Sequence, residues 1–187
     1  MAEYITQFDF SLLYWIQNTL KCAFMDFIMP KITFLGNAGL IWLLWAVIML
    51  LIPKYRRSAV LLLAGLIAGV LMGNAVMKNL FARPRPCWLD TSVQLLVLVP
   101  HDFSFPSGHT LSSVIAATVL TSADRRFGVI AVLLAFLIAF SRLYLFVHFP
   151  TDVVISVILG IAIGTAALKF GGKLFDRIIG AKQNRAE

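Results

Sequence analysis

Cations and histidines gather in three short stretches of this chain, at residues 78–86, 106–109 and 141–152. The side chains in them that could do chemistry are Lys78, Arg85, His109, Arg142, His148 and Asp152. Each stretch lies at the end of a long apolar segment, in a chain of which only 13% of the residues are charged. Because ammonium and guanidinium groups bind phosphate oxygens strongly, this pattern predicts a site for the phosphate of a membrane lipid.

The second stretch, P-S-G-H, has the composition of a helix start. Pro106 suits the first helical position, so the N–H groups of Ser107 and Gly108 are expected to be unpaired donors at the positive end of the helix dipole, where a phosphate can bind. Gly108 lets an anion approach closely. His109 follows and can give or take a proton. Alone, the tetrapeptide is a common loop-to-helix turn and a weak signal.

The third stretch places another histidine at a helix start. Pro150 can begin a helix, which puts His148 just before it and Asp152 in its first turn. A carboxylate beside an imidazole fixes its tautomer and stabilises its cation. We therefore expect His148 to be the nucleophile and His109 the acid.

The first stretch supplies two more cations. Lys78 ends an apolar segment, and Pro84 and Pro86 stop the helix. Arg85 can bind phosphate oxygens in bidentate fashion, whereas Lys78 acts as a point charge. Together with Arg142 they can offset the charge on the oxygens during phosphoryl transfer. Such a site needs no metal, and the sequence has no H-E-x-x-H or C-x-x-C pattern, so no cofactor is expected.

The composition is that of an integral membrane protein. Hydrophobic residues make up 60% of the 187 residues, more than a soluble domain of this size needs. The net charge of +7 comes from short clusters between apolar runs, which argues against nucleic acid as a partner. Two cysteines are too few for a disulfide framework.

The apolar segments predict an all-α, polytopic membrane protein with a single domain. Five segments are long and apolar enough to span a bilayer, at 32–52, 58–77, 106–123, 127–147 and 150–169. The last turns of the fourth are expected to face protein or water, since a lipid-facing Arg142 is costly.

The N-terminal segment at 8–27 interleaves apolar and polar residues, which is typical of an amphipathic helix lying in the membrane interface. The alternative is a short sixth span. The expected layout is therefore six helices, one interfacial and five transmembrane. The chain divides into an interfacial helix at 1–30, a transmembrane core at 31–170 and a basic cytoplasmic tail at 171–187.

The distribution of basic residues predicts the orientation. Ten lie on one side of the predicted spans, which the positive-inside rule makes cytoplasmic, and they are Lys54, Arg56, Arg57, Arg125, Arg126, Lys169, Lys173, Arg177, Lys182 and Arg185. The other six are Lys21, Lys31, Lys78, Arg83, Arg85 and Arg142. The three stretches therefore share the extracytoplasmic face, although 74 residues separate Lys78 from Asp152.

Glycines recur at four-residue steps in two of the predicted spans. They are Gly65, Gly69 and Gly73 in the second, and Gly160 and Gly164 in the fifth. Small residues at this spacing let helices approach closely. The glycines favour packing within one chain, and a homodimer face is the alternative.

Together the three stretches resemble the signature of the type 2 phosphatidic acid phosphatase family, K-x6-R-P, P-S-G-H and S-R-x5-H-x3-D. No position departs from it, and the matching residues are Lys78, Arg85, Pro86, Pro106, Ser107, Gly108, His109, Ser141, Arg142, His148 and Asp152. The complete signature is highly specific, whereas each part alone is not.

The resemblance implies a metal-independent phosphatase with a phosphohistidine intermediate. It implies that the residue at His148 attacks phosphorus, that Asp152 orients it and that His109 protonates the leaving oxygen. It further implies that the phosphate is held by Lys78, Arg85, Ser107, Gly108 and Arg142.

The substrate is expected to be a lipid phosphate or diphosphate at the outer face of a bacterial inner membrane. Undecaprenyl diphosphate ranks first, and phosphatidylglycerophosphate or phosphatidate is the alternative. Two alternatives are not enzymes: an inactive lipid-binding or transport protein, and a small membrane scaffold. Intact His109, His148 and Asp152 argue against these.

Three residues near the signature have open roles. Arg83 is a candidate for an extra phosphate or headgroup contact, although the family spacing selects Arg85. His101 and Asp102 either touch a headgroup or belong to a solvated loop.

Overall fold

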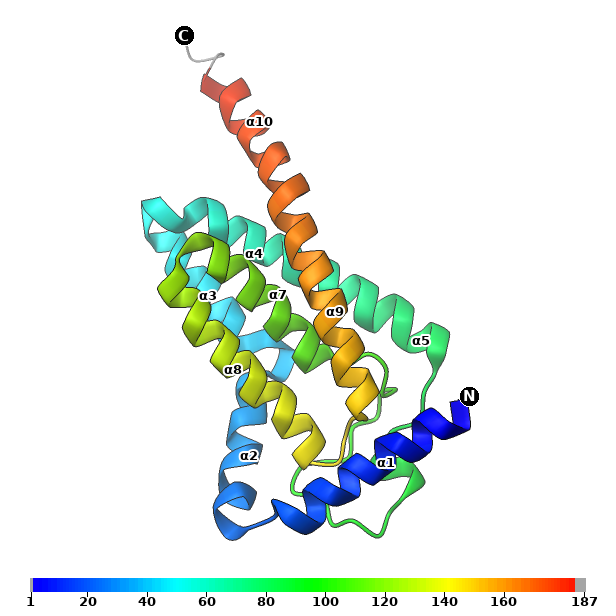
Figure 1. The fold of residues 1–187 in the computed structure, drawn as a ribbon. Helices are drawn as coiled ribbons and strands as arrows, with labels where there is room; N and C mark the ends of the chain where they lie inside the picture. The colour runs from blue at the N-terminus through cyan, green and yellow to red at the C-terminus, as the bar shows by residue number, and fades with distance from the viewer. Residues whose placement is uncertain (1, 184–187) are drawn as a thin grey trace.

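The structure is a computed structural model that describes residues 2–183, and over this range it is helical and has no strand (Figure 1). The α-helices are α1 (Ala2–Thr19), α2 (Ala23–Leu35), α3 (Leu40–Leu51), α4 (Arg56–Gly69), α5 (Lys78–Phe81), α6 (Pro86–Leu89), α7 (Gly108–Ala123), α8 (Arg125–Tyr144), α9 (Pro150–Ala166) and α10 (Gly172–Gln183). Two π-helical stretches, Val70–Met77 and Ala167–Gly171, join α4 to α5 and α9 to α10. The all-α prediction is confirmed.

Among residues 2–183, three helical segments are long and apolar enough to cross a membrane: Pro53–Leu89, which is interrupted between α5 and α6, Arg125–Tyr144 and Pro150–Arg177. The pair formed by α2 and α3, bent by 48°, makes a fourth if it is counted as one broken span. The remaining predicted span, 106–123, corresponds to α7, which has only 16 residues. At 1.5 Å per residue, α7 is shorter than a bilayer's apolar core.

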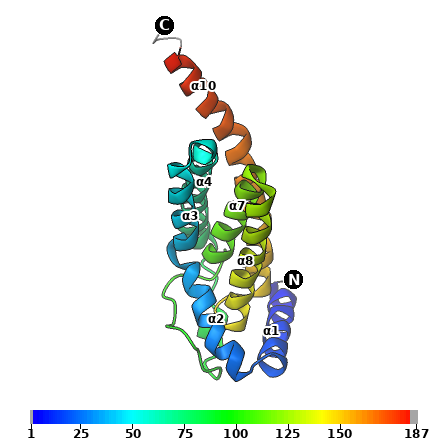
Figure 2. The ribbon, with the colours of Figure 1, turned by 90° about the vertical axis from the view of Figure 1, so that its left-hand side faces the viewer.

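Helix α7 is the centre of the bundle. It packs against α4, α8 and α9, which surround it in both views (Figures 1 and 2). Leu111, Ile115 and Val119 recur at four-residue steps and are fully buried. Trp42 of α3 donates from Nε1 to Ser113 Oγ at 3.0 Å, which ties α3 to the same helix. The short central helix is therefore covered mainly by other helices.

Glycines allow these helices to approach α7 closely. A Cβ at Gly160 would lie 2.7 Å from Val114 on α7, and one at Gly164 would lie 2.8 Å from Thr118. The glycines at 65, 69 and 73 likewise face side chains of α7. Both rows of glycines thus contribute to packing within the chain, which is the interpretation that the sequence favoured over a homodimer face.

The N-terminal segment forms two helices instead of the single predicted one at 8–27. Helix α1 ends at Thr19 and α2 begins at Ala23, so the predicted interfacial helix is wrong in its extent. Helix α1 is amphipathic, since Leu13 and Ile16 are buried while Trp15 is exposed. It lies across the ends of α8 and α9 near the loop end of the bundle (Figure 1).

Two interruptions of regular α-helix lie beside the cavity that the three sequence stretches share. Between α2 and α3, the chain turns through Asn37–Gly39, where Ala38 and Gly39 have φ of 50° and 69°. Only the glycine adopts such a φ without strain. The π-helical stretch Val70–Met77 shifts the side-chain register just before Lys78, and such stretches often occur at functional sites.

The predicted basic tail at 171–187 is helical as far as it is described. Helix α10 continues α9 away from the bundle (Figure 1). Arg57 of α4 pairs with Asp176 of α10 at 2.8 Å. Arg185, counted above among the cytoplasmic cations, lies outside the described residues.

The close contact of α9 with α7 makes a stability prediction. Gly160→Ala would place a Cβ 2.7 Å from Val114 and 3.2 Å from the carbonyl oxygen of Leu111, and backbone cannot yield as a side chain can. We expect the free energy of unfolding to fall by about 1–3 kcal/mol, measured as a lower Tm in detergent. Gly171→Ala is the control, because its added Cβ would meet only the end of Leu61 at 3.1 Å. Equal Tm values for the two variants would contradict the packing account.

Candidate active site

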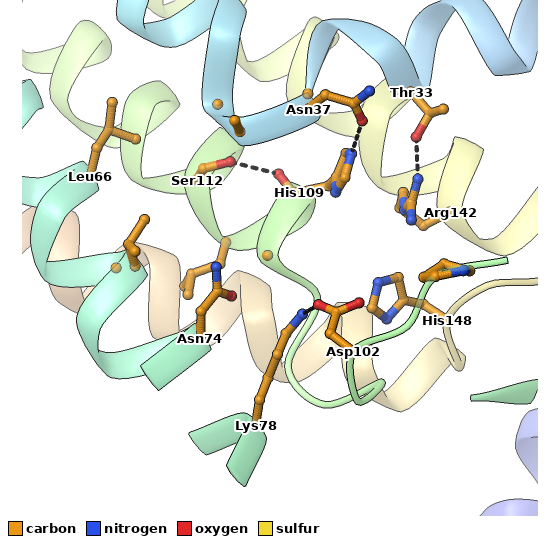
Figure 3. A pocket seen from close by; sticks show the side chains of 18 of the residues that line it. Thr33, Asn37, Leu66, Asn74, Lys78, Asp102, His109, Ser112, Arg142 and His148 are labelled. Atoms are coloured by element: carbon orange, nitrogen blue, oxygen red, sulfur yellow. Dashed lines mark hydrogen bonds and ion pairs between the residues drawn. The ribbon is translucent and has the colours of Figure 1, made fainter. Parts of the chain in front are cut away.

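The three stretches meet at one cavity of about 930 Å³ (Figure 3). Six of the eight predicted site residues line it, and they are Lys78, Arg85, Gly108, His109, Arg142 and His148. The other two, Ser107 and Asp152, are fully buried behind its wall. Residues from α5, α7, α8 and the loops between them therefore converge on a single space.

Arg85 is the most firmly held cation of the site. It precedes Pro86, the first residue of α6, and is accordingly extended, with φ −82° and ψ 153°. Its Nε donates to the carbonyl of Asp102 at 2.7 Å, and one terminal nitrogen donates to the carbonyl of Val147 at 2.6 Å. The same terminal nitrogen lies 3.1 Å from His148 Nε2. With its side chain 2% exposed, Arg85 is a fixed donor beside the imidazole.

The contact with Arg85 defines the tautomer of His148. A guanidinium has only donors, so Nε2 of His148 is the acceptor and carries the lone pair. The proton then lies on Nδ1, which faces Ser104 Oγ at 3.5 Å and Asp152 Oδ2 at 3.6 Å. Burial, followed by the nearby cations Arg85 and Arg142, holds the pKa of His148 well below its usual value. His148 is thus a neutral base with its lone pair available at Nε2.

Asp152 is held in place from several sides. It lies in the first turn of α9, where its Oδ2 accepts from the backbone N–H of Phe149 at 2.9 Å and from Ser104 Oγ. Its Oδ1 accepts from Arg83 at 2.6 Å. These donors fix the carboxylate beside Nδ1 of His148, the arrangement in which a carboxylate orients an imidazole.

Arg142 has an unused donor inside the protein. Its side chain, 6% exposed, points from the last turn of α8 into the cavity, and one terminal nitrogen donates to Thr33 Oγ1 (Figure 3). In the described part of the chain, its buried Nε has no hydrogen-bond partner. Since a buried charged donor is costly to leave unpaired, this nitrogen favours an anion in the cavity.

The start of α7 differs from the sequence prediction. The helix begins at Gly108, not at Pro106, and Ser107 is its N-cap. Ser107 N–H donates to Ser156 Oγ at 2.8 Å, while Ser107 Oγ accepts from Thr110 Oγ1 at 3.0 Å. The Ser107 N–H is therefore engaged with α9, whereas its hydroxyl caps α7 as an acceptor and keeps its O–H as a donor. Gly108 lines the cavity, and a Cβ there would lie 3.2 Å from Asn74 Oδ1.

His109 stands on the α2–α3 side of the cavity, away from His148 (Figure 3). Its Nε2 is 2.9 Å from Oδ1 of Asn37, the first residue of the turn between α2 and α3. Gly36 leaves room for the ring, because a Cβ there would lie only 2.7 Å from His109 Cδ2. The irregular turn thus positions the second histidine.

Asp102 lines the cavity and pairs with its cations, although it is not part of the sequence signature. Its carboxylate pairs with Lys78, and it accepts from Arg85 at 2.7 Å (Figure 3). Burial raises the pKa of Asp102, but the ion pairs with Lys78 and Arg85 outweigh it and lower the pKa to about 2. The carboxylate therefore occupies part of the anion site. Its position near the second stretch was noted from the sequence, but nothing there paired it with Lys78.

Arg83, whose role the sequence left open, does not line the cavity. Its guanidinium binds Asp152 at 2.6 Å and Asp9 at 2.7 Å. His101, in contrast, is exposed in the loop before α7. No pattern in the sequence indicated that Thr33 would contact Arg142 or that Asn37 would contact His109.

The far side of the cavity is apolar. Helices α2, α3 and α4 and the π-helical stretch that follows α4 contribute to its wall Phe34, Leu43, Leu63, Leu66, Ile67, Val70 and Leu71. Several of these are exposed at the bundle surface, where lipid would lie. The cavity therefore combines a cationic end with an apolar side, which suits a ligand that has an anionic head and a hydrocarbon chain. Within residues 2–183, no group of three or more His, Cys, Asp or Glu is placed to hold a metal ion.

Apolar helices long enough to cross a membrane surround a cavity lined by cations, which is the architecture of an integral membrane protein with a cavity suited to an anion. The sequence model of the PAP2 superfamily matches residues 57–176, so the chain belongs to this superfamily. The resemblance noted from the three stretches is confirmed.

Individual relatives agree with this assignment. An undecaprenyl-diphosphatase of Sulfolobus acidocaldarius is 30% identical over 64% of this chain, and the match spans 58% of that relative's length. The crystal structure of Aquifex aeolicus LpxE has a TM-score of 0.76 at 28% identity, covering 86% of this chain and 94% of the other. The PAP2-type phosphatidylglycerolphosphate phosphatase of Bacillus subtilis has a TM-score of 0.74 at 26% identity, covering 91% and 87%.

The position of Asp102 predicts competition with bound anions. Asp102→Asn removes the carboxylate that pairs with Lys78 and Arg85, so vanadate or phosphate should bind more tightly. For a half-exposed ion pair we expect about a fivefold lower inhibition constant, equivalent to roughly 1 kcal/mol. Because the pKa of Asp102 is about 2, the carboxylate stays ionised at working pH, and the gain should be the same from pH 5 to 8.

The control for this prediction is Asp90→Asn. Asp90 belongs to the same loop but accepts from Tyr14 and Ser92, away from the cations. The inhibition constants should be measured for both variants and the wild type. Weaker vanadate binding in Asp102→Asn would mean that Asp102 holds the cations in place instead of competing for them.

Proposed function

We propose that this chain hydrolyses the phosphate or diphosphate of a membrane lipid through a phosphohistidine formed at His148. The observation that carries the proposal is the neutral, buried His148, whose Nε2 lone pair lies beside Arg85 in a cavity that also has an apolar wall. A nucleophile, anion-binding cations and a surface for a lipid chain are thereby combined in one space.

In the proposed first step, the terminal phosphate enters among Lys78, Arg85 and Arg142 and displaces the carboxylate of Asp102. The Nε2 lone pair of His148 forms the bond to phosphorus, and the bond from phosphorus to the leaving oxygen breaks. His109, on the other side of the cavity, takes up a proton once the anionic phosphate offsets the nearby cations, and it gives that proton to the leaving oxygen. The cations offset the negative charge on the phosphoryl oxygens throughout.

In the second step, water attacks the phosphohistidine. His109, now neutral, takes a proton from the water, and phosphate leaves as His148 recovers its lone pair. In both steps Asp152 faces Nδ1–H of His148 and stabilises the positive charge on the phosphorylated ring. The lysine, arginine, histidine and aspartate side chains named here supply the charges and move the protons, so the proposed cycle includes no metal.

The substrate we rank first is undecaprenyl diphosphate, which would be converted to undecaprenyl phosphate. The name of the Sulfolobus relative supports it. Phosphatidylglycerophosphate is the second candidate, because the chain covers 87% of the Bacillus structure of that specificity; phosphatidate belongs to the same glycerophospholipid class. The excess of basic residues on the opposite side supports a site that faces outward from a bacterial inner membrane.

Phosphate release by the detergent-purified protein tests this proposal. The four lipids to compare are undecaprenyl diphosphate, undecaprenyl phosphate, phosphatidylglycerophosphate and phosphatidate, each in EDTA. We expect release from at least one of them, inhibition by vanadate and no release by His148→Ala, since that variant lacks the nucleophile. The order of kcat/KM values would identify the substrate class.

Two results would contradict the proposal. Loss of activity in EDTA that magnesium restores would overturn the metal-independent mechanism. Folded wild-type protein that binds these lipids but releases no phosphate would instead favour a lipid-binding or transport role.

A further inference from the structure

A row of buried charges runs from the N-terminal helix to the proposed nucleophile, outside the cavity. It consists of Asp9 on α1, Arg83 after α5, and Asp152 on α9, which faces His148. Asp9 and Asp152 are fully buried, and the side chain of Arg83 is 21% exposed. None of the first three lines the cavity, so the mechanism above gives no role to Asp9 or Arg83.

The carboxylate of Asp9 bonds Arg83 and the first turn of α9. Its Oδ2 accepts from Arg83 at 2.7 Å and from Thr151 Oγ1 at 2.6 Å, and its Oδ1 accepts from the backbone N–H of Thr151 at 3.0 Å. Thr151 is in the first turn of α9, where a carboxylate also interacts favourably with the helix dipole. A residue of α1 thus stabilises the start of the helix that carries Asp152.

Arg83 joins the two carboxylates. One terminal nitrogen donates to Asp152 Oδ1 at 2.6 Å and to Thr151 Oγ1 at 2.8 Å, while the other donates to Asp9. The guanidinium also lies 4.1 Å from the ring centroid of Phe149. Burying two carboxylates is costly unless a cation pairs with both, so the guanidinium is held between them and in turn holds Asp152.

We propose that Asp9 and Arg83 are positioning residues for His148, acting through Asp152. Asp9 directs Arg83, Arg83 fixes Oδ1 of Asp152, and Oδ2 is thereby aligned with Nδ1 of the imidazole. Helix α1 lies outside the residues 57–176 that the superfamily model matches, yet it completes the support of the nucleophile. This inference rests on the proposed function, in which His148 attacks phosphorus.

The test compares kcat and KM for Asp9→Asn, Arg83→Gln and the double variant. Asp9→Asn keeps the shape but removes the charge, so kcat should fall about tenfold, the scale of one lost charge-assisted hydrogen bond. KM and the vanadate inhibition constant should stay unchanged, because neither residue touches the anion site. In the double variant, Asp9→Asn should add little to the loss caused by Arg83→Gln, since the first residue acts through the second.

The matched control is Gln17→Leu, also on α1. Gln17 donates to the carbonyl of Tyr144 at 2.7 Å and attaches α1 to α8 without touching the charged row. We expect its kcat to equal that of the wild type. An equal loss of kcat in Gln17→Leu and Asp9→Asn would show that only the docking of α1 matters, and would overturn the inference.

Two further outcomes are decisive. A raised KM or weakened vanadate binding in Asp9→Asn would mean that the row acts on the substrate site, contrary to the proposal. If Asp9→Asn does not fold, Thr151→Val replaces it, because the Thr151 hydroxyl bonds both Asp9 and Arg83. In that variant kcat should fall while KM stays constant. An unchanged kcat would overturn the inference. A wild type that releases no phosphate contradicts the proposed function itself, which keeps the two failures distinct.

Discussion

Three buried cations, Lys78, Arg85 and Arg142, repel one another inside an apolar helical bundle, and the site depends on holding them together. Backbone carbonyls of Asp102 and Val147 accept from Arg85, and the carboxylate of Asp102 pairs with two of the cations. Among residues 2–183, the buried Nε of Arg142 still has no hydrogen-bond partner. A doubly charged phosphate would satisfy this excess of donors, which is why the cavity suits an anion.

The same cations make His148 suitable as a nucleophile. Their positive field and the burial of the ring keep the imidazole neutral, while Arg85 leaves the lone pair on Nε2. In the proposed cycle the phosphorylated ring would carry positive charge among cations, so it would need a carboxylate at Nδ1. Asp152 meets that need only if it is itself held, which is where Ser104 and Arg83 contribute.

The sequence predicted what depends on local pattern and on motif spacing. Apolar segments predicted an all-α membrane protein, and the signature predicted six residues that line one cavity. Pairings across long separations could not be predicted, because nothing local in a sequence selects the partner. Asp9 and Arg83 are 74 residues apart, and Asn37 and His109 are 72 apart. The place of Ser107 was mispredicted for another reason: it caps α7 from outside the helix, although a serine before a helix can cap it as well as bind a ligand.

The central claim is that phosphate is transferred to His148, and rapid-quench labelling tests it most directly. Protein mixed with the best lipid substrate should be quenched under alkaline conditions within one turnover and its peptides analysed by mass spectrometry. The account predicts an acid-labile phosphoryl group on His148 in the wild type and none in His148→Ala. A phosphoryl group on His109, or none in protein that releases phosphate in the same experiment, would contradict it.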